Sequence, residues 1–142
     1  MNKGFSLVEM IIVFAIMSVM GTVVLTTYMS IRKTGDATRA GMVQVAALVN
    51  ANARARVMES DTDWGVKVSS TSTTIFSGAS FATRVGVRDA VYSIPNGLTI
   101  TGPSEIVFAK FSGTPSLVGT TTFSNDYGTS SVYVWLGGII GN

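Results

Sequence analysis

A single apolar run near the N-terminus limits what this chain can fold into. Between Phe5 and Leu25 the only ionisable side chain is Glu9. The run is close to the roughly 20 residues that an α-helix needs to cross the hydrocarbon core of a bilayer. We therefore expect residues 5–25 to form a membrane-spanning helix.

Glu9 is unusual within this run, because an acidic side chain well inside a membrane helix costs about 2.5–3.5 kcal/mol on insertion scales. Two interpretations stay open. Either Glu9 lies near the helix start and reaches interfacial water, or it has a function in an apolar setting. The segment before the run, Met1–Gly4, is very short and carries one lysine. A secretory signal peptide would be cut after its apolar run, and no clear Ala-x-Ala site follows Leu25.

The first residues resemble a known N-terminal signal. Lys3-Gly4-Phe5-Ser6-Leu7-Val8-Glu9, followed by an apolar helix, is similar to the class III signal of type IV prepilins and pseudopilins. The resemblance implies that prepilin peptidase cuts between Gly4 and Phe5 on the cytoplasmic side and that the new amino group of Phe5 is methylated. It also implies that Glu9 neutralises the terminal amine of a neighbouring subunit inside an apolar filament core, where a cation needs a partner.

Length and composition leave room for little else. Of the 142 residues, fewer than about 90 remain for a soluble part, which is one small domain. The chain has no Cys and no His, so disulfides, thiolate chemistry, the commonest general base and the usual zinc ligand are excluded. The formal charge of +2 does not suggest electrostatic nucleic-acid binding. We expect no enzyme, no cofactor and no metal site.

The helix is expected to continue beyond the membrane. Residues 26–58 contain no proline and carry apolar or small residues at steps of three and four, as one face of an amphipathic helix does. These residues are Ile31, Thr34, Thr38, Met42, Val45, Val49 and Ala53. The predicted organisation is a leader at 1–4, a helix at 5–58 whose first part (5–25) is the anchor and whose second part (26–58) is amphipathic, and a globular domain at 59–142.

Charge gives a conflicting indication of topology. The charged residues after the membrane run are mostly basic: Arg32, Lys33, Asp36, Arg39, Arg54 and Arg56. They would lie on the translocated side if the leader stays in the cytoplasm, which opposes the positive-inside rule. The prepilin signal is the stronger indication, so we place the leader in the cytoplasm. For Arg54 and Arg56 we favour a solvated helix end, where cations suit the helix dipole.

The C-terminal part has the pattern of a small antiparallel β-domain. Short runs rich in β-branched and aromatic residues alternate with turn signals such as Pro95-Asn96-Gly97 and Asn125-Asp126-Tyr127-Gly128. The expected strands are 64–68, 73–76, 91–94, 98–101, 106–111, 119–123 and 132–136. The fold class is therefore α+β, a long N-terminal helix packed against a small antiparallel sheet or sandwich. We expect Trp64, Phe108, Tyr133 and Trp135 to be core aromatics.

The head also resembles a particular subgroup. Ala53-Arg54-Ala55-Arg56, Trp64-Gly65-Val66, Ile106-Val107-Phe108 and Val132-Tyr133-Val134 before Gly137-Gly138 are similar to landmarks of the GspH and FimT group of minor pilins and pseudopilins. The resemblance implies a pilin fold.

Two groups of charged residues are candidates for binding. Asp61 and Asp63 have a spacing that could place oxygens around Ca²⁺, although the EF-hand series is absent and an ordinary loop is favoured. Arg84, Arg88 and Lys110 could form a basic patch for DNA, although solvated surface charge is favoured.

The predicted function is that of a pilin-like structural subunit, polymerised through its N-terminal helix into a pilus or a type II secretion pseudopilus. Its partners would be identical or related subunits, prepilin peptidase, the inner-membrane assembly platform with its ATPase, and lipid before assembly. The alternative is a minor tip subunit whose head binds DNA or a secreted substrate. The precursor would be a single-pass protein of the cytoplasmic membrane, and the filament would be periplasmic or extracellular.

Overall fold

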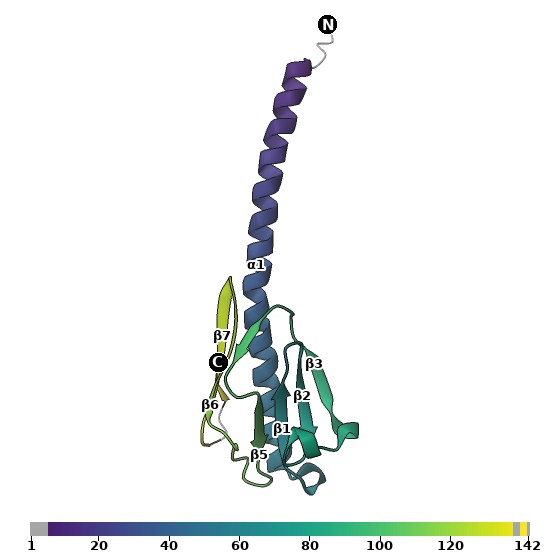
Figure 1. Ribbon diagram of the computed structural model, residues 1–142, viewed down its shortest axis with the longest axis vertical. Coiled ribbons are helices and arrows are strands. Elements are labelled where there is room, and N and C mark those ends of the chain that lie inside the picture. The colour runs from purple at the N-terminus through teal and green to yellow at the C-terminus, as the bar shows by residue number, and fades with distance from the viewer. Residues whose placement is uncertain (1–5, 138–139, 142) are drawn as a thin grey trace.

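The computed structural model describes residues 6–137 and 140–141, and one helix dominates it (Figure 1). This helix, α1 (Leu7–Arg56), begins with a capping box: the Val8 amide donates to Ser6 Oγ at 3.3 Å, and the Ser6 amide donates to Glu9 Oε2 at 3.2 Å. Such reciprocal bonds satisfy amides that have no partner in the first turn. The predicted long N-terminal helix is confirmed.

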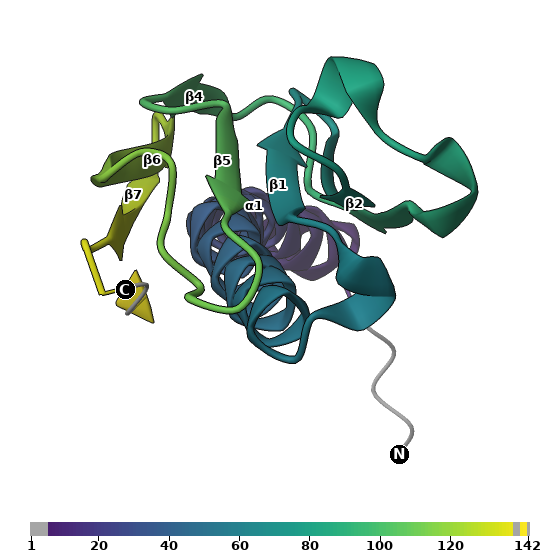
Figure 2. The ribbon, with the colours of Figure 1, turned by 90° about the horizontal axis from the view of Figure 1, so that it is seen from below.

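Two four-stranded antiparallel sheets form the head, and Figure 2 shows them lying around one side of α1. The first has the order β3-β2-β1-β5, from β1 (Trp64–Val68), β2 (Ser72–Ser77), β3 (Ala90–Ser93) and β5 (Glu105–Phe108). The second has the order β4-β6-β7-β8, from β4 (Thr99–Thr101), β6 (Gly119–Asn125), β7 (Gly128–Val134) and β8 (Ile140–Gly141). Three short 3₁₀ helices lie in the connections, η1 (Glu59–Asp61), η2 (Phe81–Thr83) and η3 (Gly86–Arg88). The α+β fold class is confirmed.

The head packs on a face of α1 that is built from small residues. Ala40, Ala47, Ala51 and Ala55 are buried there together with Leu48. Alanine side chains let both sheets approach the helix closely. The two sheets supply the larger side chains of the core: Trp64, Val66, Ile75, Ile106, Phe108, Phe123, Val132 and Val134.

Only part of the apolar helix face predicted from the sequence packs on the head, where Val45 contacts the core. Ile31, Met42 and Val49 are 68%, 60% and 52% exposed. The reason is volume, since the sheets are filled with aromatic and branched side chains and need small residues opposite them. The larger apolar residues are therefore left on the opposite side of α1.

The strands differ from the predicted ones mainly at their ends. β5 stops at Phe108 instead of Phe111, because Phe111 has a left-handed backbone with φ of 69°. β7 begins four residues earlier than predicted, because Asn125 Oδ1 accepts hydrogen bonds from the amides of Tyr127 and Gly128 and closes a tight turn. The hairpin of β6 and β7 is consequently longer than its apolar residues alone indicate.

Two of the expected core aromatics are outside the core. Trp64 and Phe108 are buried as predicted, but Trp135 is 59% exposed and Tyr133 is also exposed. Along β7 the buried side chains are Val132 and Val134, so the alternation of a strand places Tyr133 and Trp135 on the other face. The strand was identified, but its inward face was assigned wrongly for Trp135.

Candidate assembly site on the N-terminal helix

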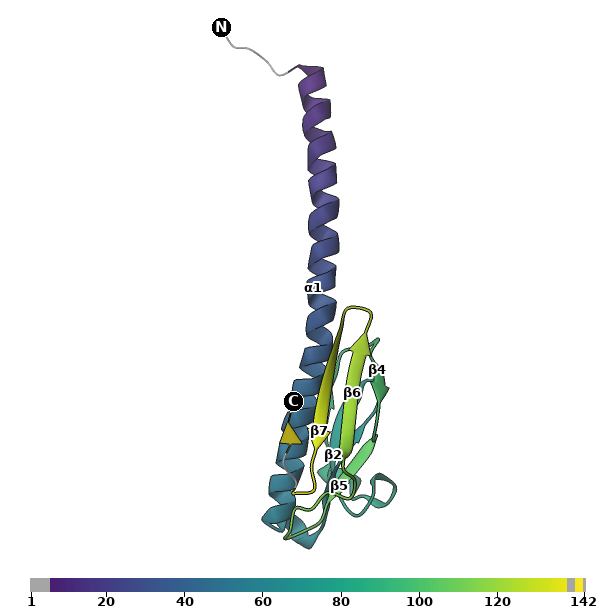
Figure 3. The same ribbon diagram turned by 90° about the vertical axis from the view of Figure 1, so that its left-hand side faces the viewer.

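The first half of α1 extends beyond the head (Figure 3). All side chains from Leu7 to Met29 are exposed, and the helix is long and apolar enough to cross a membrane (Figure 3). Its serine and threonine hydroxyl groups are satisfied within the helix, because Ser18, Thr22, Thr26 and Thr27 each donate to a backbone carbonyl three or four residues earlier. A helix whose polar groups bond internally is suited to lipid, which offers no hydrogen-bond partners. We call residues 7–29 the membrane half.

Glu9 lies in the first turn of this half. Its carboxylate accepts from the Ser6 amide at the positive end of the helix dipole. That position agrees with the interpretation that Glu9 lies near the helix start, and it leaves the carboxylate exposed for a partner from another molecule. The predicted cleavage residues, Gly4 and Phe5, lie outside the described residues, and the intersubunit role of Glu9 stays a prediction.

An exposed apolar surface continues along α1 beyond the membrane half. It consists of Ile31, Gly35, Met42, Val49 and Val57, and we call it the outer stripe. At Gly35 an added Cβ would have no neighbour within 4 Å, so that the helix backbone is open to approach. The membrane half and the outer stripe together give α1 one uncovered apolar side from its first turn to its end.

Comparison with known proteins bears on the start of this helix. Residues 1–25 match the family model of the prokaryotic N-terminal methylation motif. The motif indicates a type IV pilin-like prepilin signal that is processed by a peptidase, and together with the apolar helix it indicates membrane anchoring. The match covers the signal and most of the membrane half but not the head. No curated protein and no solved structure matches the chain.

The two aspartates that were considered as calcium ligands, Asp61 and Asp63, both contact a lysine residue. Asp61 Oδ1 lies 2.9 Å from Lys110 Nζ, and Asp63 Oδ1 accepts from the Lys110 amide at 2.8 Å. The hydrogen bond that Lys110 donates to Asp61, and then the negative charge of Asp61, raise the pKa of Lys110 above its ordinary value. These contacts join the loop after α1 to the loop after β5. Within residues 6–137 and 140–141, no three acidic side chains are grouped closely enough to hold a metal ion.

Two of the three cations considered as a DNA-binding patch, Arg84 and Lys110 but not Arg88, have an ion-pair partner in the described residues. Arg84 Nε lies 2.6 Å from Asp89 Oδ2, and its guanidinium lies over the Phe81 ring at 3.7 Å. Lys110 pairs with Asp61 on a different loop. These ion pairs reduce the positive charge that Arg84 and Lys110 present, and DNA binding by this head stays a prediction.

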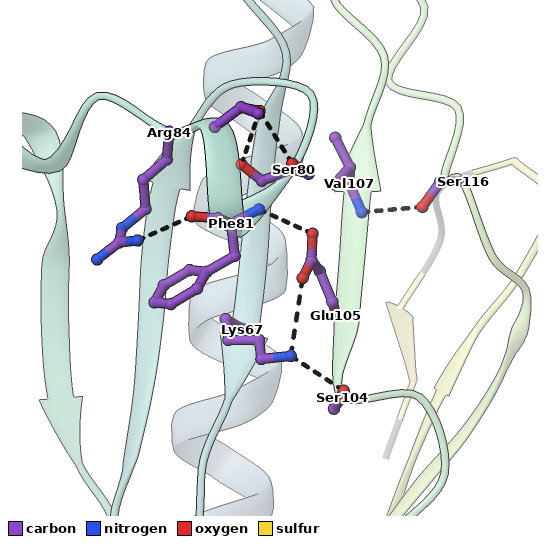
Figure 4. Close-up of polar contacts among 9 residues, drawn as sticks. Lys67, Ser80, Phe81, Arg84, Ser104, Glu105, Val107 and Ser116 are labelled. Atoms are coloured by element: carbon purple, nitrogen blue, oxygen red, sulfur yellow. Dashed lines mark hydrogen bonds and ion pairs between the residues drawn. The ribbon is translucent and has the colours of Figure 1, made fainter.

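Sequence analysis missed the residues that fix η2 over the outer face of the first sheet. Figure 4 shows Glu105 accepting from the Phe81 amide, at 2.9 Å, and facing Lys67 Nζ, at 3.7 Å. The Phe81 ring then meets the buried Phe76 ring edge to face, 5.5 Å between centroids. Phe76 in turn lies over Gly65, its partner on β1. A glycine inside a strand, which marks close approach by another group, was the signal that could have found this packing.

Proposed function

We propose that this chain is a type IV pilin-like structural subunit, which prepilin peptidase cuts between Gly4 and Phe5 and which polymerises through α1 into a pilus or a type II secretion pseudopilus. The observation that carries the proposal is the uncovered apolar side of α1. It begins in the segment that matches the methylation motif and continues along the outer stripe to Val57.

The extent of this apolar side argues for two successive environments. Lipid can cover the membrane half of the precursor, because that half has the length and hydropathy of a membrane span. Lipid does not reach Met42 or Val49, which lie about 20 Å and 30 Å further along the helix axis than Met29. A contiguous exposed apolar surface is typical of an interaction site. Packing against α1 of other subunits would cover the outer stripe and the membrane half together.

Glu9 is proposed to act between subunits. In a filament the methylated amine of Phe5 would be drawn into an apolar core, where its charge needs a partner far more than in water. Glu9 is exposed in the first turn and is the only acidic residue of the membrane half. Its bond to the Ser6 amide uses one carboxylate oxygen and leaves the other for the amine of a neighbour.

We also propose that the head is of the kind found in the GspH and FimT group, which it resembles in sequence. In its support, two of the landmark segments lie side by side: Trp64 pairs with Phe108, and Val66 with Ile106, across β1 and β5. We further propose that the inner-membrane assembly platform and its ATPase are the partners that extract the subunit from the membrane.

The test must separate the charge of Glu9 from its capping bond. Glu9→Val removes both, and Glu9→Gln keeps a side chain that can complete the capping box but removes the charge. Ser6→Ala removes the bond from the Val8 amide to Ser6 Oγ, which is the other half of the box, but keeps the Glu9 charge. Each variant is made in cells with no other copy of the gene. Leader removal is measured by mass spectrometry of membrane protein, and assembly by the amount of subunit in sheared surface filaments.

We expect all three variants to be inserted and processed. Glu9→Val and Glu9→Gln should be depleted from filaments, whereas Ser6→Ala should assemble. Assembly of Glu9→Gln at the wild-type level would refute the charge-pairing role. A mature chain that begins after Leu25 would refute the whole proposal, because the segment would then be a conventional signal peptide.

A further inference from the structure

The basic residues just beyond the membrane half lie together beside a groove. Arg32, Lys33 and Arg39 of α1 line it together with Asp36, and its opposite wall is the β3–β4 turn at Ser93–Asn96. The groove is open to solvent and has a volume of about 620 Å³. Figures 1 and 3 show that this end of the head, where the turns of β3–β4 and β6–β7 meet α1, faces the membrane half.

These three cations differ from most others in the head. Arg54, Lys67, Arg84 and Lys110 each form an ion pair with a carboxylate. No carboxylate within residues 6–137 and 140–141 lies within 4.0 Å of the charged nitrogens of Arg32, Lys33 or Arg39. Asp36 is the only acidic residue among those that line the groove, so three positive charges share it with one negative charge, and Asp126 lies on the neighbouring β6–β7 turn.

The head holds this part of α1 in a fixed place. Asn125 Nδ2 donates to the Lys33 carbonyl oxygen at 2.7 Å, and Thr34 Oγ1 donates to the Tyr127 carbonyl oxygen at 3.1 Å. Lys33 Nζ lies 4.7 Å from the centre of the Tyr127 ring. The stretch of α1 that carries the three cations is therefore held in place by the β6–β7 turn on one side, and the β3–β4 turn lies on the other side.

Helix geometry puts the groove at headgroup depth. The uncharged run from Met10 to Ile31 is about 33 Å long, slightly more than the hydrocarbon core of about 30 Å. Arg32 and Lys33 are thus the first charged residues above the hydrocarbon, and helical side chains lean towards the N-terminus, which here is towards the membrane. Tyr28, which is exposed one turn earlier, suits the aromatic belt of the interface.

We propose that this groove binds the phosphate of an anionic phospholipid in the leaflet into which α1 emerges, with Arg32 and Arg39 as the phosphate ligands. The proposal rests on the proposed function in so far as that function makes the precursor a membrane-anchored subunit. It also explains the charges that oppose the positive-inside rule: they hold the head against the membrane until the subunit is extracted.

The experiment compares two double variants that remove the same charge from the same helix. Arg32→Gln/Arg39→Gln removes the groove arginines, and Arg54→Gln/Arg56→Gln removes two arginines at the far end of α1. Each full chain is placed in nanodiscs of phosphatidylcholine with a minor fraction of phosphatidylglycerol. The lipids that stay bound after transfer to detergent are then counted by native mass spectrometry. Circular dichroism of each variant checks that the chain is folded.

Wild type and the Arg54/Arg56 variant should retain phosphatidylglycerol in preference to phosphatidylcholine. The Arg32/Arg39 variant should lose about fivefold of this preference for each arginine removed, or about 25-fold in total. Equal retention of both lipids by wild type would overturn the proposal, as would an equal loss in the two double variants. So would DNA-duplex binding that depends on Arg32 and Arg39 without any lipid preference. None of these outcomes depends on filament assembly, so a failure of the proposed function is recognised separately.

Discussion

The two halves of α1 are one continuous helix, but different surroundings stabilise them. In the membrane half every side chain is exposed within the chain itself, and the residues are large and apolar on all sides. In the second half the buried face consists of alanines with Leu48, Gln44 and Asn52, and the head covers it. The first half needs surroundings of lipid or of other helices, whereas the buried face of the second half needs only its own head.

Polar groups show the same difference. The hydroxyl groups of the membrane half bond to their own helix, as at Thr22. The buried amides of the second half bond across to the head: Thr73 Oγ1 donates to Gln44 Oε1 at 3.2 Å, and Asn52 Nδ2 donates to the Gly113 carbonyl oxygen at 2.8 Å. Because its serine and threonine hydroxyls bond within the helix, the membrane half can move between lipid and a filament. The hydrogen bonds that join Gln44 and Asn52 to the head fix the head on the second half.

The largest expected effect comes from emptying the head core. Phe108→Ala should lower the free energy of unfolding by about 3–5 kcal/mol, because it removes a fully buried ring. Trp135→Ala, the matched exposed aromatic, should cost about 1 kcal/mol or less. Unfolding of the chain in detergent micelles, followed by circular dichroism because Trp135→Ala removes one of the two tryptophans, measures both.

Hydrogen exchange of the same Phe108→Ala variant sharpens the comparison. Amides of residues 37–55 should exchange faster than in wild type, while amides of residues 7–29 in a bilayer should not change. Equal acceleration in both halves would show that the head supports the whole helix, contrary to this account.

A smaller effect is expected from overfilling the outer face of the first sheet. A Cβ at Gly65 would clash with the Phe76 ring, which Phe81 holds from the other side. Gly65→Ala should therefore destabilise the head by about 1–3 kcal/mol. Gly86→Ala is the control, since a Cβ there meets nothing within 4 Å, and its unfolding midpoint should match that of wild type.

Breaking a bond between helix and head should cost somewhat less. Gln44→Met keeps the volume but leaves the buried Thr73 hydroxyl without its acceptor, so we expect a loss of about 1–2 kcal/mol. Adding Thr73→Val should recover part of it. Thr22→Val, which changes a hydroxyl of the membrane half, should leave unfolding of the head unaltered; a comparable loss there would contradict the separation of the two halves.

The smallest effect concerns pH. Asp61 raises the pKa of Lys110 above its ordinary value of 10.5, so their interaction stabilises the fold fully below that value and is lost as the pH rises through the raised pKa. Lys110 is exposed, and the change is expected to be slight. Wild type and Lys110→Met should differ in unfolding free energy at pH 8 and converge at the alkaline end; a difference that grows with pH would have the wrong sign.

The sequence predicted the helix, its membrane segment and most strands because each has a local signature. The apolar run with its single Glu9 identifies the anchor, and alternation identifies β5 and β7. It did not predict which side of α1 meets the head. That choice depends on the bulk of Trp64, Phe108 and Phe123 opposite the helix, which favours alanine over Ile31 or Met42, and no periodicity within the helix reports it.

Alternation alone also cannot tell which face of β7 points inward, and the face predicted to be buried, with Tyr133 and Trp135, is the exposed one. Val132 and Val134 form one set and Tyr133 and Trp135 the other, and both sets are apolar enough for a core. The groove at Arg32 and Arg39 could not be predicted from the sequence either, because its second wall comes from a turn about sixty residues away in the chain, at Ser93–Asn96. Contacts of this kind are set by tertiary packing.

The central claim is that other subunits cover the uncovered side of α1, and thiol accessibility tests it most directly. The chain has no cysteine, so Met42→Cys on the outer stripe and Val87→Cys on η3 each introduce a single thiol. Both should react rapidly with a maleimide-polyethylene glycol in membrane-resident processed protein, since both positions are exposed there. In sheared filaments the thiol at position 42 should be protected while that at position 87 still reacts. Equally rapid labelling at both positions in filaments would contradict the account.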